Sequence, residues 1–306
     1  MTRNAPRSID QYLKALRDEL AGEDAALIQD ALYDAEEYLR AEVAAHPEKS
    51  ESDVLELIAS TYGAPDEVAG AYRDTEAKVK AAMTTPRKIP TGGAGAFFGV
   101  FLDPRAYTSL FFMLLSLATG IIYFTFAVTG LSLSAGLAVL VIGIPFFVLF
   151  MALTRVISLA EGRLIEAMTG ERMPRRPVHQ GEAAGFWARV GQMLKDRRTW
   201  TTLAYLILML PLGIFYFVIA VVGVSLSLAL IFSPLINVAG YYGWFGLPGD
   251  VYWSPEWLGS AFMQPLLVLA GVLLLTLLMH LARGIGRLHA LYAKALLVAP
   301  TAPTAP

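Results

Sequence analysis

The chain has 306 residues, 56% of them apolar, and its mean hydropathy of +0.53 is far from that of a soluble protein and indicates several membrane spans. It contains no cysteine, which excludes disulfides and cysteine-based metal or redox chemistry. Residues 1–92 carry 11 Lys/Arg against 18 Asp/Glu, whereas residues 93–306 carry 13 against 8. An acidic, water-soluble head therefore precedes a mildly basic membrane body.

Residues 1–82 are predicted to form a small all-helical domain on the cytoplasmic side. Apolar side chains recur at helical spacing, and Ser8 and Ser50 each begin a capping pattern typical of a helix N-terminus. Gly22 is placed to end the first helix, and Gly63 is placed to end the third in the left-handed conformation.

The charge of this head supports two interpretations. Residues 8–76 contain 18 acidic and 5 basic side chains. They are either a solvated helical surface or a docking face for a basic protein, for which Asp30, Asp34 and Glu37 are the candidate residues. Such a face repels DNA, so direct binding of nucleic acid is not expected.

The head also resembles a known signalling module. The pattern Y-L-x-x-L-x-x-x-L, then an acidic helix, then S-x-x-D-V-L-x-x-I-A-x-x-Y-G-A-P-D-E-V-A is similar to the HAAS domain over residues 8–75. The resemblance implies a module attached to bacterial membrane proteins and linked to PadR-type transcriptional regulators. The matching residues are Tyr12, Leu13, Leu16, Leu20, Ile58, Gly63, Pro65 and Ala69.

Residues 83–95 are rich in Pro, Gly and Thr and are predicted to be a flexible linker. Residues 96–296 are predicted to form a four-span membrane domain, and residues 297–306 a disordered tail. The spans are expected near 106–128, 135–157, 199–222 (with a possible continuation to 236) and 264–281. Residues 129–134 are expected to make a tight hairpin, and apolar stretches at 97–102 and 186–194 to form helices in the membrane interface.

The membrane domain contains an internal repeat. Residues 103–134 and 196–227 align without a gap at an offset of 93, with 16 identities in 32 positions. The two copies begin with the same Asp-x-Arg charge pattern, so they are a parallel duplication rather than an inverted one. We expect an all-α fold with two tandem two-helix repeats, at about 96–170 and 186–296.

Lys and Arg placement predicts the orientation in the cytoplasmic (inner) membrane. Residues 155–198 hold nine basic side chains, and residues 237–264 hold none. The N-terminus, the central loop and the C-terminus are therefore expected in the cytoplasm, and both hairpins are expected to face outward.

The outward segment 237–264 is where the repeat breaks down. Its aromatic side chains are either an anchor at the outer interface or a surface that senses a lipid, an amphiphile or envelope stress. The candidate sensing residues are Tyr241, Tyr242, Trp244, Trp253 and Trp257.

The body resembles a bacterial sensor-domain family of four-span membrane proteins, found free-standing or ahead of histidine-kinase cores. The matching motifs are D-P-R-A-Y at 103–107, G-L-A-V-L-V-I-G-I-P at 136–145, L-A-E-G-R-L-I-E-A-M-T-G at 159–170 and L-P-L-G-I-F-Y-F-V-I-A-V at 210–221. The resemblance implies a sensory role and names no ligand. The sequence contains neither a phosphoacceptor-histidine helix nor an ATP-binding segment of the kinase-linked members.

No catalytic constellation, metal site or cofactor motif is recognisable, so we expect a protein without enzymatic activity. The leading hypothesis is a sensor in which a signal alters the packing of the repeats and reaches the head through the linker, changing its hold on a regulator. An accessory or lipid-binding subunit of an export system is the alternative, and a small-molecule permease is a weaker one. Candidate partners are the lipid bilayer, a PadR-type regulator or another basic cytoplasmic protein, and a second copy of the chain in a homodimer.

Overall fold

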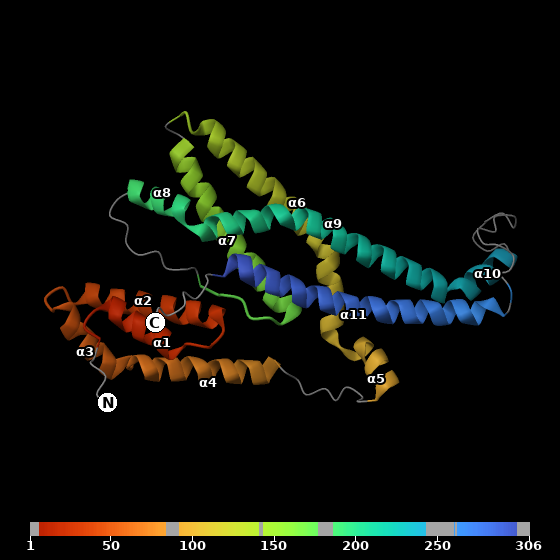
Figure 1. Cartoon of the computed structure of the whole chain (residues 1–306), viewed down its shortest axis with the longest axis horizontal. Helices are drawn as coiled ribbons and strands as arrows, with labels where there is room; N and C mark the ends of the chain where they lie inside the picture. The colour runs from red at the N-terminus through yellow and green to blue at the C-terminus, as the bar shows by residue number, and fades with distance from the viewer. Residues whose placement is uncertain are drawn as a thin grey trace. The chain divides into compact units, whose positions relative to one another are not determined.

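The computed structural model describes residues 6–83, 92–140, 143–176, 186–242, 260 and 262–298. Within these ranges every regular element is a helix (Figure 1), which confirms the predicted all-α class. The elements are α1 (Ile9–Glu19), α2 (Ala25–Ala45), α3 (Glu51–Thr61), α4 (Pro65–Met83), α5 (Gly93–Phe98), the 3-10 helix η1 (Gly99–Leu102), α6 (Pro104–Leu137), α7 (Gly143–Thr169), α8 (Phe186–Lys195), α9 (Arg197–Ile231), α10 (Ser233–Tyr241) and α11 (Met263–Leu297).

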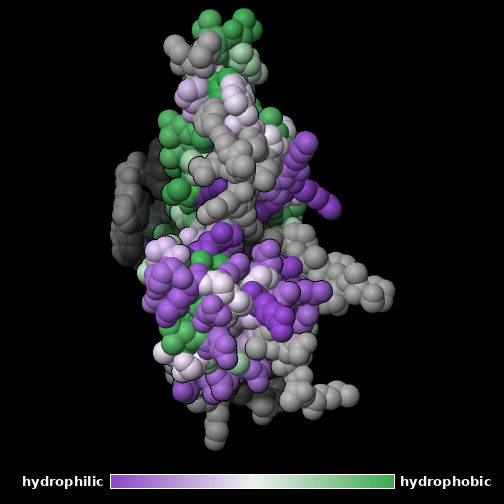
Figure 2. All heavy atoms as spheres, turned by 90° about the vertical axis from the view of Figure 1, so that its left-hand side faces the viewer, coloured by the Kyte–Doolittle hydropathy of each residue, from purple (hydrophilic) through white to green (hydrophobic). Residues whose placement is uncertain are grey.

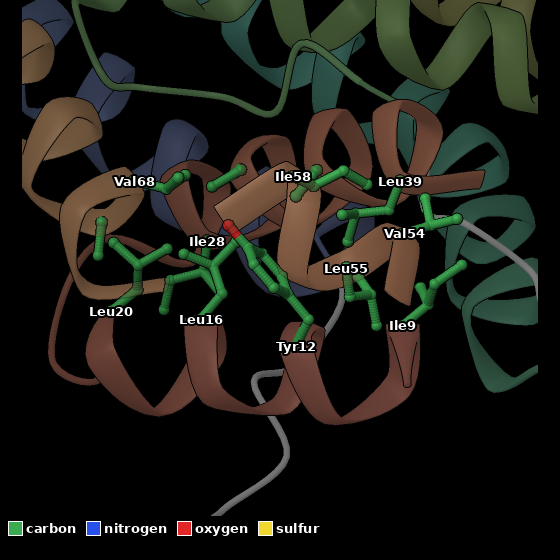
Figure 3. Close-up of a cluster of buried hydrophobic side chains, with 13 residues drawn as sticks. Ile9, Tyr12, Leu16, Leu20, Ile28, Leu39, Val54, Leu55, Ile58 and Val68 are labelled. Carbon is green, nitrogen blue, oxygen red and sulfur yellow. The ribbon is translucent and has the colours of Figure 1, made fainter. Parts of the chain in front are cut away.

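Helices α1–α4 form the head around one apolar core. Figure 3 shows Tyr12 and Leu16 of α1 pointing toward side chains of α2, α3 and α4. The side chains that the HAAS-like pattern shares with this chain are mostly core residues, since Tyr12, Leu16, Leu20, Ile58 and Ala69 are all buried. The pattern therefore reports how the head folds. The face of the head seen in Figure 2 is mostly hydrophilic, as a water-soluble domain requires.

The predicted helix caps of the head are confirmed. The Ser8 hydroxyl accepts a hydrogen bond from the Gln11 amide, and the Ser50 hydroxyl accepts one from the Asp53 amide. Gly63 has the left-handed φ of 112° that favours glycine after a helix. The Tyr12 hydroxyl donates to the Gly63 carbonyl at 2.8 Å, which ties α1 to the turn between α3 and α4.

The described chain divides into two compact units, each made of more than one stretch of sequence. One unit contains Met1–Arg87, Gly130–Tyr205 and Leu291–Pro306, and the other contains Lys88–Thr129 and Leu206–Ala290. The head thus belongs to the same unit as α7, α8 and the last residues of α11.

Among the described residues, four helices are long and apolar enough to cross a membrane: α6, α7, α9 and α11. Each is longer than the predicted span. The predicted second and fourth spans end at 157 and 281, whereas α7 continues to Thr169 and α11 continues to Leu297. Charged side chains mark where the apolar part of a helix ends, but they do not interrupt helical hydrogen bonding, so the helices continue past them.

The predicted hairpin at 129–134 is wrong, because α6 continues through these residues to Leu137. The turn follows, with the Leu140 amide bonded to the Leu137 carbonyl and the Gly143 amide to the Leu140 carbonyl, both at 2.9 Å. Gly130 is a packing residue, since a Cβ atom there would lie 2.0 Å from the Phe150 ring of α7. Its lack of a side chain admits that ring and does not mark a turn.

The sequence repeat is accompanied by repeated contacts at the start of α6 and α9. Asp103 accepts a hydrogen bond from the Arg105 amide at 3.0 Å, and Asp196 accepts one from the Arg198 amide at 3.0 Å. Each carboxylate therefore satisfies an amide in the first turn of its helix, where the helix dipole favours negative charge.

Aromatic side chains repeat in the same way. The Tyr107 hydroxyl donates to the Phe101 carbonyl at 3.0 Å, and the Trp200 indole donates to the Leu194 carbonyl at 2.8 Å. Both bonds connect a spanning helix to the short helix before it, η1 or α8. The two stretches predicted to lie in the membrane interface are thus both helical and both bonded to the following span.

The repeated glycines bring α6 and α9 together in a reciprocal contact. A Cβ atom on Gly120 would lie 2.7 Å from the carbonyl oxygen of Met209, and one on Gly213 would lie 2.2 Å from that of Ser116. Met209 occupies the position in the second repeat that Ser116 occupies in the first, so the glycine of each helix contacts the equivalent residue of the other helix. This exchange of equivalent contacts is what a two-fold interface makes, and small residues permit it.

We predict that Gly213→Ala will lower the stability of the membrane domain. Alanine favours helix formation by about 1 kcal/mol over glycine, but its methyl group meets backbone that cannot rotate away, and overpacking of this kind costs about 1–3 kcal/mol. Gly284→Ala is the matched control, because nothing lies within 4 Å of a Cβ atom at that position. Thermal unfolding of both variants in one detergent, followed by circular dichroism, tests this. A Gly213→Ala midpoint equal to that of Gly284→Ala would contradict close packing at the crossing.

Candidate functional site

A short segment after α7 carries three arginines, and we call residues 170–176 the arginine segment. Gly170 has a left-handed φ of 75° and donates its amide to the Glu166 carbonyl at 2.9 Å, which ends the helix. Met173 is fully buried, and a Cβ atom on Gly162 of α7 would lie 3.4 Å from the Met173 Cβ. The segment therefore folds back and packs on α7 through an apolar side chain.

The head binds the backbone of this segment through Asp30 of α2. One carboxylate oxygen of Asp30 accepts hydrogen bonds from the amides of Arg175 and Arg176 at 2.8 and 2.9 Å. The Gln29 side-chain amide donates to the Arg176 carbonyl at 2.6 Å. Asp30 is only 4% exposed, so these bonds replace the water that its carboxylate has lost.

Arginine side chains of the segment pair with acidic side chains of the head. Arg172 forms ion pairs with the second Asp30 oxygen, at 3.0 Å, and with Glu76 of α4. Arg176 pairs with Asp34 at 2.8 Å, and its guanidinium lies 5.9 Å from the centre of the Tyr33 ring.

Arg175 points elsewhere, because its guanidinium pairs with Glu166 of α7 at 2.7 Å. Its amide binds the head while its side chain binds the helix from which the segment comes. A further ion pair joins the head to the end of α11, between Asp24 and Lys294. The segment is thus bonded on both sides, to the head and to a membrane helix.

Burial dominates the electrostatics of this contact. It raises the pKa of Asp30 above its usual value, although the amides of Arg175 and Arg176 and the Arg172 guanidinium act in the opposite direction. Burial also raises the pKa of Tyr72, whose hydroxyl donates to Asp34 at 3.0 Å. The hydrogen bond to Glu166 raises the pKa of Arg175. The contact therefore joins desolvated charges, which makes it sensitive to the loss of any one partner.

The predicted docking residues occupy different places in this arrangement. Asp30 and Asp34 both face the arginine segment, whereas Glu37 is exposed on α2. Of the predicted sensing residues, Tyr241 ends α10 and Tyr242 is 66% exposed. Trp244, Trp253 and Trp257 lie outside the described residues, so the sensing surface stays a prediction.

The structure contains a buried polar cluster that the sequence does not predict. Glu161 of α7 is fully buried, and its carboxylate accepts a hydrogen bond from the Tyr205 hydroxyl of α9 at 2.7 Å. The Tyr205 ring lies 5.6 Å from that of Tyr292 in α11. The predicted second span ends at 157, so Glu161 falls in the predicted central loop. The helical spacing of Thr154, Ser158, Glu161 and Ile165, all buried, was the available signal.

The other compact unit has a buried histidine. His289 of α11 is 1% exposed, lies 3.4 Å from the Tyr216 hydroxyl, and has its ring 4.8 Å from the centre of the Phe112 ring. Each compact unit thus holds a tyrosine hydroxyl of α9 beside an ionisable side chain. These polar contacts cross between helices, where they specify how the apolar surfaces align.

We predict that Asp30→Ala will release the arginine segment from the head. The substitution leaves two amides without their acceptor and removes one of the two carboxylates that pair with Arg172, and breaking a buried charge pair costs about 3–5 kcal/mol. Hydrogen exchange of the Arg175 and Arg176 amides, measured by mass spectrometry on the full chain in lipid nanodiscs, should accelerate by about a hundredfold or more. Glu37→Ala should leave the exchange at the wild-type rate. Equal protection in both variants would show that Asp30 does not hold the segment.

Comparison with known proteins identifies a family for most of the membrane domain. A family model described as "Putative sensor" matches residues 112–297, which is more than half of the chain and covers α7, α9, α11 and most of α6. No curated protein and no solved structure is significantly similar to the chain.

Proposed function

Because the chain belongs to this sensor family, we propose that it is a multi-pass membrane sensor that passes an envelope or intramembrane signal to a cytoplasmic regulator through its head. The observation that carries the proposal is the contact between the head and the arginine segment. That segment continues directly from α7, so a displacement at the end of this helix acts on Asp30 without an intermediate element.

The input is proposed to act on the packing of the two repeats. The crossing of α6 and α9 at Gly120 and Gly213 has backbone against backbone, so a small shift there cannot be absorbed by side-chain rotation. A signal drives such a shift only if it binds the two arrangements with different affinity. The outward segment, with Tyr242 exposed at its start, is the proposed site of that binding.

The output is proposed to be the hold of the head on a regulator. The HAAS-like pattern of the head supports this, and the family match supports a role in sensing rather than catalysis. The proposed route runs through α7 and the arginine segment. It differs from a route through the linker, whose residues 84–91 lie outside the described part of the chain.

The proposed orientation places both termini and the arginine segment in the cytoplasm. Reporter fusions after residue 180 and after residue 306 should report a cytoplasmic position, and a fusion after residue 246 an external one. The reason is that Lys and Arg side chains lie near the first two positions, whereas residues 237–264 contain none. An external reading at residue 180 would remove the regulator-facing role of the segment.

Signalling is tested by transcript levels in the native host at matched amounts of protein in the membrane. Deletion of the gene should change a defined set of transcripts, and Gly213→Ala and Asp30→Ala should each change the same set. Gly284→Ala and Glu37→Ala are the matched controls and should resemble wild type. Unchanged transcripts in the deletion strain would defeat the signalling role. A change in exported material alone would favour the export-subunit hypothesis.

A further inference from the structure

We propose that the acidic face of the head, formed by Gln29, Asp30, Asp34 and Glu76, is a binding site for an arginine-bearing segment of a partner protein, and that the chain's own arginine segment occupies this site as a competitor. The inference rests on the proposed function, since it specifies how the head engages a regulator. The face is more than a group of acidic residues, because a peptide segment is seated on it with defined backbone and side-chain contacts.

The backbone contacts do not depend on the side chains of the bound segment. Asp30 accepts two consecutive amides, and Gln29 donates to the carbonyl of the second residue of that pair. Any segment with the same local backbone path can make these three bonds. The backbone part of the site therefore fits a second peptide as well as it fits the segment present.

The side-chain contacts give the site its chemical preference. Arg172 reaches both Asp30 and Glu76, and Arg176 reaches Asp34 and the Tyr33 ring. Two guanidinium groups four residues apart are thus recognised, which lysine matches poorly because it lacks the planar fork. A matching partner carries R-x-x-x-R in a segment that follows the same bent backbone path as residues 172–176.

Arg175 is excluded from this recognition because its side chain binds Glu166 of α7. Together with buried Met173, it attaches the segment to the membrane domain rather than to the head. The contacts of the arginine segment therefore divide into an anchor on α7 and a ligand for the head. A movement of α7 withdraws the ligand through the anchor and exposes the face.

Competition of this kind favours the segment of the same chain. A ligand in the same chain acts at a raised effective concentration, so a free partner binds only weakly until the chain's own segment is withdrawn. The face is consequently closed at rest and opens when the membrane domain changes.

The test uses the full chain in nanodiscs and a fluorescent synthetic peptide with the sequence of residues 169–176. Wild type should bind the peptide weakly, whereas Arg172→Ala combined with Arg176→Ala should bind it at least about tenfold more tightly, because the competing segment then keeps only its backbone bonds to the face. Glu166→Ala, which weakens the anchor and leaves the face intact, should also increase binding. Adding Asp30→Ala to the double variant should abolish the gain.

Peptide variants test which arginine side chains the acidic face recognises. Replacing the peptide residues that correspond to Arg172 and Arg176 by alanine should remove binding. Replacing the residue that corresponds to Arg175 should leave the affinity within about twofold, because the Arg175 side chain pairs with Glu166 at an exposed position and not with the face. Thermal unfolding of each chain variant confirms folding. Equal binding by wild type and the double variant, or binding that does not need Asp30, would overturn the proposal.

The outcome is separable from that of the proposed function. Peptide competition without any change of transcripts would retain the site and reject the signalling role. Altered transcripts without peptide competition would retain signalling and reject this site as the place where the regulator binds.

Discussion

A buried carboxylate needs hydrogen-bond donors in place of the water it has lost. In this protein, that requirement at Asp30 determines where the head binds the arginine segment. Asp30 receives two backbone amides and one guanidinium. Backbone amides are directional and cannot adjust as a flexible side chain can, so they fix the register between α2 and the arginine segment. The more exposed pairs around them, such as Arg176 with Asp34, add less to the stability of the contact.

The helices of the head were predictable because their signals are local. Ser8, Ser50 and Gly63 each act within one turn of the chain, and the apolar spacing of Tyr12 and Leu16 is set by the helix itself. The membrane helices were predictable in number for a similar reason, since a bilayer requires long apolar runs. Their ends were not, because hydropathy records where lipid contact stops and not where helical hydrogen bonding stops.

Two residues show why the predicted ends of the membrane helices differ from the ends in the structure. The hairpin predicted at 129–134 is wrong, and Gly130 within it is explained by the Phe150 ring of α7, a contact that no local pattern records. Glu161 suggested a cytoplasmic loop, but its carboxylate is satisfied by Tyr205 on another helix. In both cases a tertiary partner reverses the meaning of a local signal.

The candidate site was half visible in the sequence. The excess of acidic side chains indicated a face for a basic segment, and Asp30 and Asp34 do contact one. That the segment belongs to the same chain was not visible, because charge indicates attraction without specifying a partner some 140 residues away. The apolar Met173 among the arginines was the one indication that this stretch packs against something.

The reciprocal contact of Gly120 and Gly213 makes the membrane domain resemble a dimer whose two subunits share one polypeptide. In a true dimer every change occurs in both subunits at once, and an interface cannot gain a feature on one side only. Joining the copies removes that restriction. Here α6 is followed by α7, which leads to the arginine segment that meets the head, whereas α9 is followed by the short helix α10. The two halves of a reciprocal contact therefore continue into unlike segments, which the identical subunits of a homodimer cannot do.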